Sequence, residues 1–244
     1  MRALLVRVGA DLSDSGGLWN GPVNGSTREF AYVPIPESSS VRPGLQKPYA
    51  ALASALNHFG WTLPTHLAGR TMHLDPDFSH LTYGDQGQRA AQISTKLQKN
   101  DLVVFYAALR DVSPQPRLLY AIIGLYVIQR IEKALCVPKT RWDENAHTRR
   151  FLSPTADDIV VTAKRGVSGR LTKCLPIGSF RTNAAEPNKR PCYRVDSALL
   201  DRWGGLTIRD GFLQRSARLP QLLDPPRFLK WFFTKNPELV AENF

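Results

Sequence analysis

Two acidic segments carry the side chains best suited to chemistry. The first is a loop after a short apolar run, where Asp11 and Asp14 precede Gly16 and Gly17. Glycines let a ligand approach the backbone closely, and a carboxylate can stabilise positive charge on a sugar or orient an attacking water. Asp11 is therefore a candidate catalytic residue. The alternative is that it only caps a turn, which Asp does readily.

The second segment contains His73, Asp75 and Asp77. Alternate residues of an extended chain point to the same side, so these three groups are predicted to share a face as a catalytic acid/base cluster. A metal site is the alternative, but it lacks a further clear ligand nearby, and His80 is only a candidate. The chain has no GxGxxG or GxxxxGK[ST] motif either, so we expect no metal and no cofactor. A hydrogen-bonded turn is the structural alternative.

A further group of residues could bind an extruded base. Arg89 and Gln92 are three residues apart on a predicted helix and share a face, where they could read a base edge or hold a phosphate. Trp19 and Tyr106 offer surfaces on which a flipped base could stack. The alternatives are a solvated helix face for the first pair and core packing for Tyr106.

The charge of the chain favours a polyanionic partner. Lys and Arg number 32 against 21 Asp and Glu, a net charge of +11. Residues 139–244 contain 19 basic and 11 acidic side chains, against 13 and 10 in residues 1–138. This excess of basic side chains suits a partner with a phosphate backbone. A generally basic enzyme is the alternative. The side chains expected to contact the backbone are Asn145, His147, Arg149, Arg150, Lys164, Arg165, Arg170, Lys189 and Arg190.

Apolar patterning predicts an α+β fold. Strands come in close succession, with helices at intervals rather than in strict alternation. This pattern favours a curved mixed sheet flanked by helices. We expect a single domain over 1–244 with a basic C-terminal third from about 164. Strands are predicted at 3–8, 29–36, 102–109, 120–131, 159–163, 172–177 and 193–195. Helices are predicted at 49–59, 86–97, 197–203 and 226–234, and a basic surface loop at 183–191.

Cysteine use and hydropathy suggest the compartment. Cys136, Cys174 and Cys192 form no CxxC pair and are odd in number, so a zinc ribbon or a disulfide framework is not expected. The longest apolar stretch, 118–129, is far below spanning length. We expect a cytoplasmic protein without a membrane partner. The oligomeric state is left open.

An ordered set of short motifs resembles a known family. The set is similar to the third family of nucleotide-modification-associated domains over roughly residues 1–165, with departures at Ala10 and at Asn100-Asp101, where that family usually has Gly-Asp. The resemblance implies a role in phage and bacterial systems that make, read or remove modified DNA bases. The motifs are RVGAD at 7–11 with Gly16-Gly17, VPIP at 33–36, HLDPD at 73–77, AAQ at 90–92, DLVVFY at 101–106 and IGLYV at 123–127.

A looser likeness concerns two strands. DLVVFYA at 101–107 and IIGLYVIQRI at 122–131 resemble modified-base readers of the PUA and EVE type, which implies a curved barrel with an aromatic pocket. The leading interpretation is nevertheless a DNA glycosylase that flips out and excises a modified base from double-stranded DNA, in defence against phages with modified genomes. A reader without chemistry and an enzyme that helps to install the modification are the alternatives.

Overall fold

The fold is organised by one long strand, β7 (Leu118–Lys133). The computed structural model describes residues 1–244 apart from 115–116, 183–184, 187, 190–191 and 214–216. One edge of β7 pairs antiparallel with β6 (Leu102–Asp111), from Leu102 opposite Val127 to Arg110 opposite Leu118. The first eight residues of β6 are buried, as expected for an apolar run in the middle of a sheet.

Further strands extend this pair in both directions. On one side, β1 (Ala3–Arg7) and β2 (Pro22–Val23) both run parallel to β6. On the other, β7 pairs first with β9 (Gly169–Arg181) and then with β8 (Ile159–Ala163). Nine strands of the described chain form this sheet. The remaining members are β5 (Thr82–Asp85) on β8, and β10 (Cys192–Val195) and β11 (Leu239–Val240) on β9.

The sheet remains open. Its main path runs β1-β6-β7-β8-β5, and no pairing joins β1 to β5 among the described residues. The outer edge of β1 is occupied instead by a C-terminal segment, where Leu5 N–H donates to the Pro220 carbonyl at 2.8 Å and Leu222 N–H to the Ala3 carbonyl at 3.0 Å. The expected α+β fold with a mixed sheet is confirmed. The barrel implied by the PUA and EVE likeness is wrong, because this edge is already satisfied.

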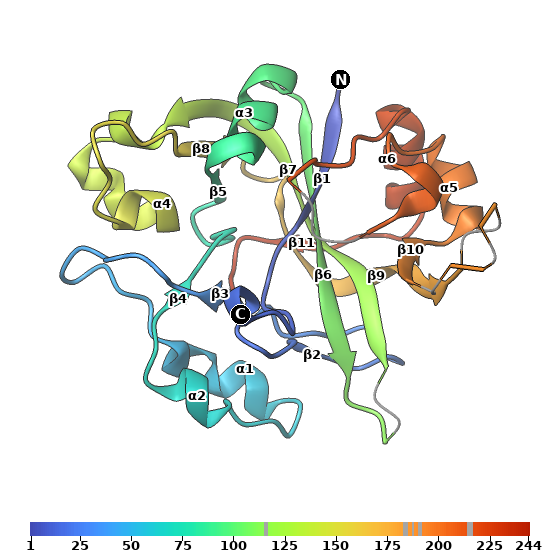
Figure 1. Cartoon of the computed structure of the whole chain (residues 1–244), viewed down its shortest axis with the longest axis horizontal. Helices are drawn as coiled ribbons and strands as arrows, with labels where there is room; N and C mark the ends of the chain where they lie inside the picture. Colours follow the sequence, from blue (N-terminus) through green and yellow to red (C-terminus); the bar gives the residue numbers. More distant parts are fainter. Residues whose placement is uncertain (115–116, 183–184, 187, 190–191, 214–216) are drawn as a thin grey trace.

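Helices flank the sheet on both sides. Figure 1 shows α5 (Ser197–Trp203) and α6 (Pro225–Phe233) on the right of the central strands, α3 (Gly87–Lys96) above them, and α4 (Ala146–Arg149) on the left beside β5 and β8. Below lie α1 (Ala53–Asn57) and α2 (Thr65–Ala68). Short 3-10 turns are η1 (Asp14–Gly16), η2 (Tyr49–Leu52), η3 (Ala134–Cys136), η4 (Lys139–Glu144) and η5 (Arg209–Gly211).

A single large core runs through these layers. Buried side chains from Leu4 on β1 to Trp203 on α5 and Phe232 on α6 belong to one hydrophobic cluster. The C-terminal helices therefore pack on the same core as the first strand, and the chain forms one compact domain. None of the helices in the described residues is long and apolar enough to cross a membrane.

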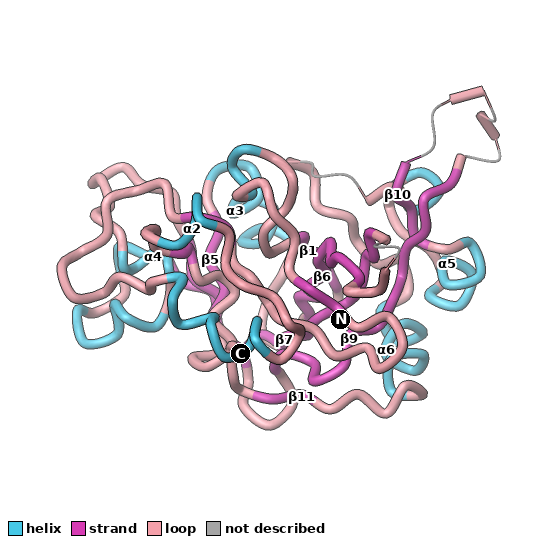
Figure 2. Tube along the Cα trace, turned by 90° about the horizontal axis from the view of Figure 1, so that it is seen from below, coloured by secondary structure: helices cyan, strands magenta, loops and turns pink. Residues whose placement is uncertain are grey.

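Two predicted elements differ from the structure. The strand expected over 29–36 is reduced to β3 (Ile35–Pro36), which pairs with β4 (Met72–His73) in a separate two-stranded sheet. Pro34 and Pro36 lack the N–H donors that a longer ladder needs. The helix expected over 49–59 is divided between η2 and α1. The predicted loop at 183–191 lies largely outside the described residues. Figure 2 shows the N-terminal strands and the chain's C-terminus from below.

Candidate active site

A cavity of about 440 Å³ lies where the Asp11 loop, β4, β5 and α4 meet. It is lined by Asp11, His73, Asp75, His147 and Arg150, among others. Segments separated by more than 130 residues thus contribute to one concave site, which is the usual setting for chemistry in an enzyme. The Asp11 loop and the segment around Asp75 both line this cavity, as the sequence predicts.

The short β3–β4 sheet positions the first histidine. Ile35 is paired with His73, and Glu37 N–H donates to the Thr71 carbonyl at 3.0 Å just beyond the pair. This register brings Glu37 beside the imidazole, with Oε2 at 2.8 Å from His73 Nδ1. Arg150 completes the group, because its Nη2 lies 3.0 Å from Glu37 Oε1 and 3.0 Å from the same imidazole nitrogen.

The charges in this group are set by burial and pairing. Burial alone would raise the pKa of Glu37, but hydrogen bonds from His73 and Arg150 lower it to about 2. Burial lowers the pKa of His73 to about 4, although its bond to Glu37 opposes that change. Near neutral pH, Glu37 is therefore a carboxylate and His73 an uncharged imidazole.

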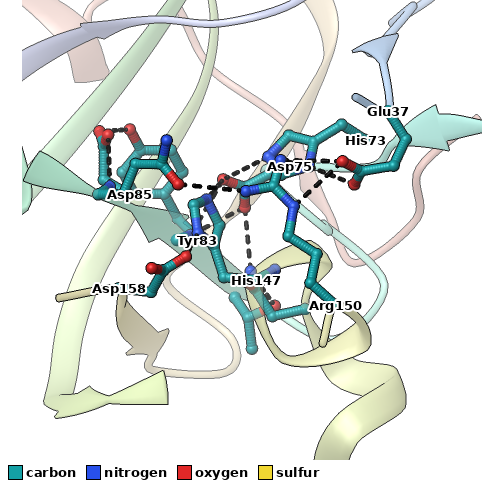
Figure 3. A network of polar contacts seen from close by, with 12 residues as sticks. Glu37, His73, Asp75, Tyr83, Asp85, His147, Arg150 and Asp158 are labelled. Carbon is teal, nitrogen blue, oxygen red and sulfur yellow. Dashed lines mark hydrogen bonds and ion pairs between the residues drawn. The ribbon is translucent and has the colours of Figure 1, made fainter. Parts of the chain in front are cut away.

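Asp75 lies at the centre of the network (Figure 3). Gly84 N–H donates to its two carboxyl oxygens at 2.9 and 3.1 Å, and the Asn145 side-chain amide donates to Oδ1 at 3.0 Å. Burial nevertheless raises the pKa of Asp75 to about 7, against the lowering effect of His147 and these donors. The Asp75 carboxyl group is thus held rigidly and poised to gain or lose a proton near neutral pH.

The second histidine comes from the tight turn of α4. Asn145 caps this helix by accepting from His147 N–H at 2.8 Å, while its amide contacts Asp75. His147 Nδ1 lies 2.5 Å from Asp158 Oδ1, and Nε2 lies 3.8 Å from Asp75 Oδ2. Gly84 makes this approach possible, because a Cβ there would lie 2.3 Å from His147 Cδ2.

The opposite part of the lining carries a second polar cluster. Tyr83 donates its hydroxyl proton to Asp85, and Arg89 Nη2 donates to the Tyr83 oxygen at 2.8 Å. Arg89 Nε also lies 2.9 Å from Asp85 Oδ2. Arg89 is the one predicted base-binding residue among the described residues that line the cavity.

The Asp11 loop closes another side of the cavity. Arg7 Nη2 lies 3.2 Å from Asp11 Oδ2, and Ser13 donates to Asp11 Oδ1 through its N–H at 2.8 Å and through its hydroxyl. Gly16 is required here, since a Cβ would lie 1.9 Å from that carboxyl oxygen. Asp11 therefore both shapes the loop and faces the cavity.

Asp77 and Arg149 lie outside this cavity. The predicted common face of residues 73–77 does not form, because β4 ends at His73 and the alternation stops there. Asp77 is instead paired with Arg149 in the interior and accepts from Asn243 at 3.0 Å. The Arg149 guanidinium is therefore buried rather than exposed to a DNA backbone, and both side chains make their contacts in the interior of the fold.

The other predicted base-binding residues also lie elsewhere. Trp19 packs on Trp61, with ring centroids 5.8 Å apart. Tyr106 is buried in the core. Gln92 joins α3 to the C-terminal segment, because its side chain donates to the Ala217 carbonyl at 2.7 Å. None of these three residues is among the described residues that line the cavity.

The predicted backbone-binding residues separate into different environments. Asn145, His147 and Arg150 belong to the network above, and Arg170 is buried with Nε donating to the Glu242 carbonyl at 2.9 Å. Lys164 and Arg165 line a second groove together with Lys99 and Arg130. Lys189 is exposed and pairs with Glu186. Arg190 lies outside the described residues.

Several site residues were missed by the sequence reasoning. Glu37 and Asp158 hold the two histidines, and Arg7 and Arg70 add positive charge to the cavity lining. His147 was predicted to contact DNA rather than to join Asp75. No local spacing signals these roles, because the partners come from the β3–β4 and β5–β8 pairings.

The cluster also offers a set of metal-ligating atoms. One atom each from His73, Asp75 and His147 lie within 4.8 Å of one another, and all three side chains are buried. Two imidazoles and a carboxylate are common ligands of transition metals. The same arrangement can also transfer protons.

Comparison with known proteins identifies the family. The family model described as nucleotide modification associated domain 3 matches residues 2–201 of the 244. The chain belongs to this family. The match confirms the resemblance seen in the motifs and extends beyond residue 165, so it includes all residues of the cavity network. No curated protein and no solved structure matches the chain.

Membership in the nucleotide modification associated domain 3 family gives the cavity a chemical context. The family description links the chain to modified nucleotides and, through them, to nucleic acid. It does not specify a reaction. The side chains around the cavity therefore determine which reactions the site can support.

Proposed function

We propose that this protein is a hydrolase that removes a modified base from a DNA nucleotide. The observation that carries the proposal is the convergence of Asp11 with the His73, Asp75 and His147 cluster in one cavity of about 440 Å³. A cavity of a few hundred cubic ångströms suits a small-molecule-sized ligand. One extruded nucleotide is such a ligand, and enzymes that act on a base in a duplex must flip it out.

Hydrolysis of an N-glycosidic bond makes two demands on the site. Water must add to the C1′ carbon, and the departing base must gain a proton as the bond to its nitrogen breaks. In the proposed reaction Asp11 stabilises the positive charge that develops on the sugar. The cluster around Asp75 orients the water, accepts its proton and passes that proton to the departing base nitrogen.

The arginines of the lining suit the phosphate groups of the substrate. Arg70 is exposed and lines the cavity, and a guanidinium can grip a phosphate through two parallel hydrogen bonds. Arg7 and Arg150 also line it, although each is paired with a carboxylate, Asp11 and Glu37 respectively. We assign the first phosphate contact to Arg70.

The residues that line the cavity favour an enzyme over a protein that binds the modified base without reacting with it. Within the described part of the cavity, Tyr83 is the only aromatic ring apart from the two imidazoles, and its hydroxyl is engaged by Asp85 and Arg89. Stacking on aromatic or apolar side chains holds a flipped base in enzymes and readers alike, so the lining separates the two only by its titratable groups. Asp11, His73, Asp75 and His147 are groups that an enzyme needs and a reader does not.

The proposal is tested by base release. The protein is incubated with plain DNA and with DNA from phages that carry modified bases, and free base and abasic sites are measured by mass spectrometry. We expect release from the modified DNA alone, and a loss of about 100-fold or more in rate for Asp11→Asn. Asp201→Asn, on the exposed face of α5, is the matched control. Stable binding without any released base would contradict the proposal and favour a reader.

A further inference from the structure

The two histidines and Asp75 present three acceptor atoms to one another. His73 Nε2 lies 4.0 Å and His147 Nε2 lies 3.8 Å from the same Oδ2 atom of Asp75. The two imidazole rings are 5.0 Å apart between centroids and nearly perpendicular. Figure 3 shows Asp75 between the two rings, with their other nitrogens directed outward.

Those outward nitrogens fix the tautomer of each ring. His73 Nδ1 lies 2.8 Å from Glu37 and His147 Nδ1 lies 2.5 Å from Asp158. Because an ionised carboxylate only accepts hydrogen bonds, His147 Nδ1 must donate to Asp158. His73 Nδ1 also lies 3.0 Å from Arg150 Nη2, which can only donate, but Glu37 at 2.8 Å is the closer partner, and we assign the His73 Nδ1 proton to that bond. In an uncharged ring, Nε2 then carries a lone pair toward Asp75. Carboxylate–histidine pairs of this kind typically orient the imidazole ligands of a metal ion.

The carboxylate between them is unable to turn away. Asp75 is held by Gly84 N–H and by the Asn145 amide, which leaves Oδ2 facing both rings. A shared proton would bring Oδ2 and an Nε2 atom to within about 3 Å of each other, whereas a metal ion bound at about 2.0–2.2 Å from each atom can span the 3.8 and 4.0 Å separations. The donor set of two imidazoles and one carboxylate suits a divalent transition-metal ion.

We propose that His73 Nε2, Asp75 Oδ2 and His147 Nε2 bind one divalent transition-metal ion, such as zinc, manganese or iron(II), with its remaining coordination positions facing the cavity. Glu37 and Asp158 are the positioning residues that orient the two ligand rings. Such an ion can lower the pKa of a bound water and polarise a substrate oxygen. The inference goes beyond the proposed base release, because it holds for any substrate that the cavity accepts.

The site is tested by metal binding to the full chain, without reference to activity. The protein is stripped with a chelator and titrated with Co²⁺, and the visible absorption of the bound ion is recorded. Retained zinc, manganese and iron are measured by mass spectrometry on untreated protein. We expect one ion per chain, a loss of the cobalt band in His147→Gln and in Asp75→Asn, and about 10- to 100-fold weaker binding in Glu37→Gln. His58→Gln is the control, because His58 is exposed and lies outside the cluster.

The outcomes separate this inference from the proposed reaction. A wild-type protein that retains no metal and shows no cobalt band overturns the metal site, even if a ligand variant fails to fold. Equal binding by wild type and by folded His147→Gln overturns it too. Metal binding without base release contradicts only the proposed reaction, whereas base release by a protein that retains no metal and gives no cobalt band contradicts only the metal site.

Discussion

The ion pair of Asp77 and Arg149 gives the sharpest prediction of stability. Both side chains are almost fully buried, with 1% and 3% of their surfaces exposed. Asp77 Oδ2 also lies 3.1 Å from His80 Nδ1, and Asp77 accepts from Asn243 at 3.0 Å. Together with Arg149 these partners lower the pKa of Asp77 to about 2 despite its burial. Asp77→Asn keeps the shape of the side chain but leaves the buried Arg149 guanidinium with only the half-exposed Asp143 carboxylate, 3.4 Å from Nε, to offset its charge.

Removing one partner of a buried ion pair costs about 3–5 kcal/mol. In a domain of this size, each kcal/mol shifts the melting temperature by roughly 2–4 °C, so we expect Asp77→Asn to melt about 6–20 °C below the wild type. Adding Arg149→Met to the same chain removes the positive charge of the guanidinium. The double variant is therefore expected to be less destabilised than the sum of the single changes.

Urea unfolding followed by circular dichroism measures these differences. Asp201→Asn, on an exposed helix position, is the control and should stay within about 0.5 kcal/mol of the wild type. The reasoning would be refuted if Asp77→Asn unfolded at the wild-type urea concentration while losing base release. That result would return Asp77 to a direct catalytic role.

Three further predictions concern other parts of the molecule. Gly84→Ala should disturb His147 and Asn145 and lower the rate of base release by about tenfold or more, because the new Cβ would lie 2.3 Å from the His147 imidazole. Gly69→Ala is the control, because Gly69 has open space around it, and this variant should release base at the wild-type rate. Burial raises the pKa of Cys174 to about 12, so its thiolate forms only as the pH rises toward that value. At pH 8, iodoacetamide should label the exposed Cys136 but leave the buried Cys174 unlabelled unless urea is added. Lys164→Ala with Arg165→Ala should weaken DNA binding and reduce the slope of log K against log salt by about 1–2, as measured by fluorescence anisotropy at several salt concentrations; an unchanged slope would remove the groove that these residues line from the DNA interface.

The sheet could be predicted where local sequence determines the outcome. The runs predicted as strands at 102–109 and 120–131 are apolar and rich in β-branched and aromatic residues, and they lie within β6 and β7. The helix at 197–203 was predicted with the bounds that the structure gives to α5. That the sheet stays open could not be predicted. It depends on residues 220–222, from the far end of the chain, which pair with the outer edge of β1.

The candidate site could be predicted only in part, for a similar reason. Asp11, His73 and Asp75 stand out by residue type, and the cavity does bring them together. His147 reaches Asp75 through the pairing of β5 with β8 and the Asn145 cap, which no spacing in the sequence reveals. Asp77 looked equivalent to Asp75, but the strand ends before it and Arg149 binds it in the interior. Catalytic roles for Asp11, His73 and Asp75 stay predictions.

The central claim is that nucleotide chemistry takes place where Asp11 meets the cluster around Asp75. The most direct test is a single-turnover measurement of base release from modified DNA by wild type and by His147→Gln, after anisotropy has shown that both bind the DNA equally. We predict that the wild type produces abasic sites and that the variant is at least about 100-fold slower. Equal rates for the two proteins would contradict the account.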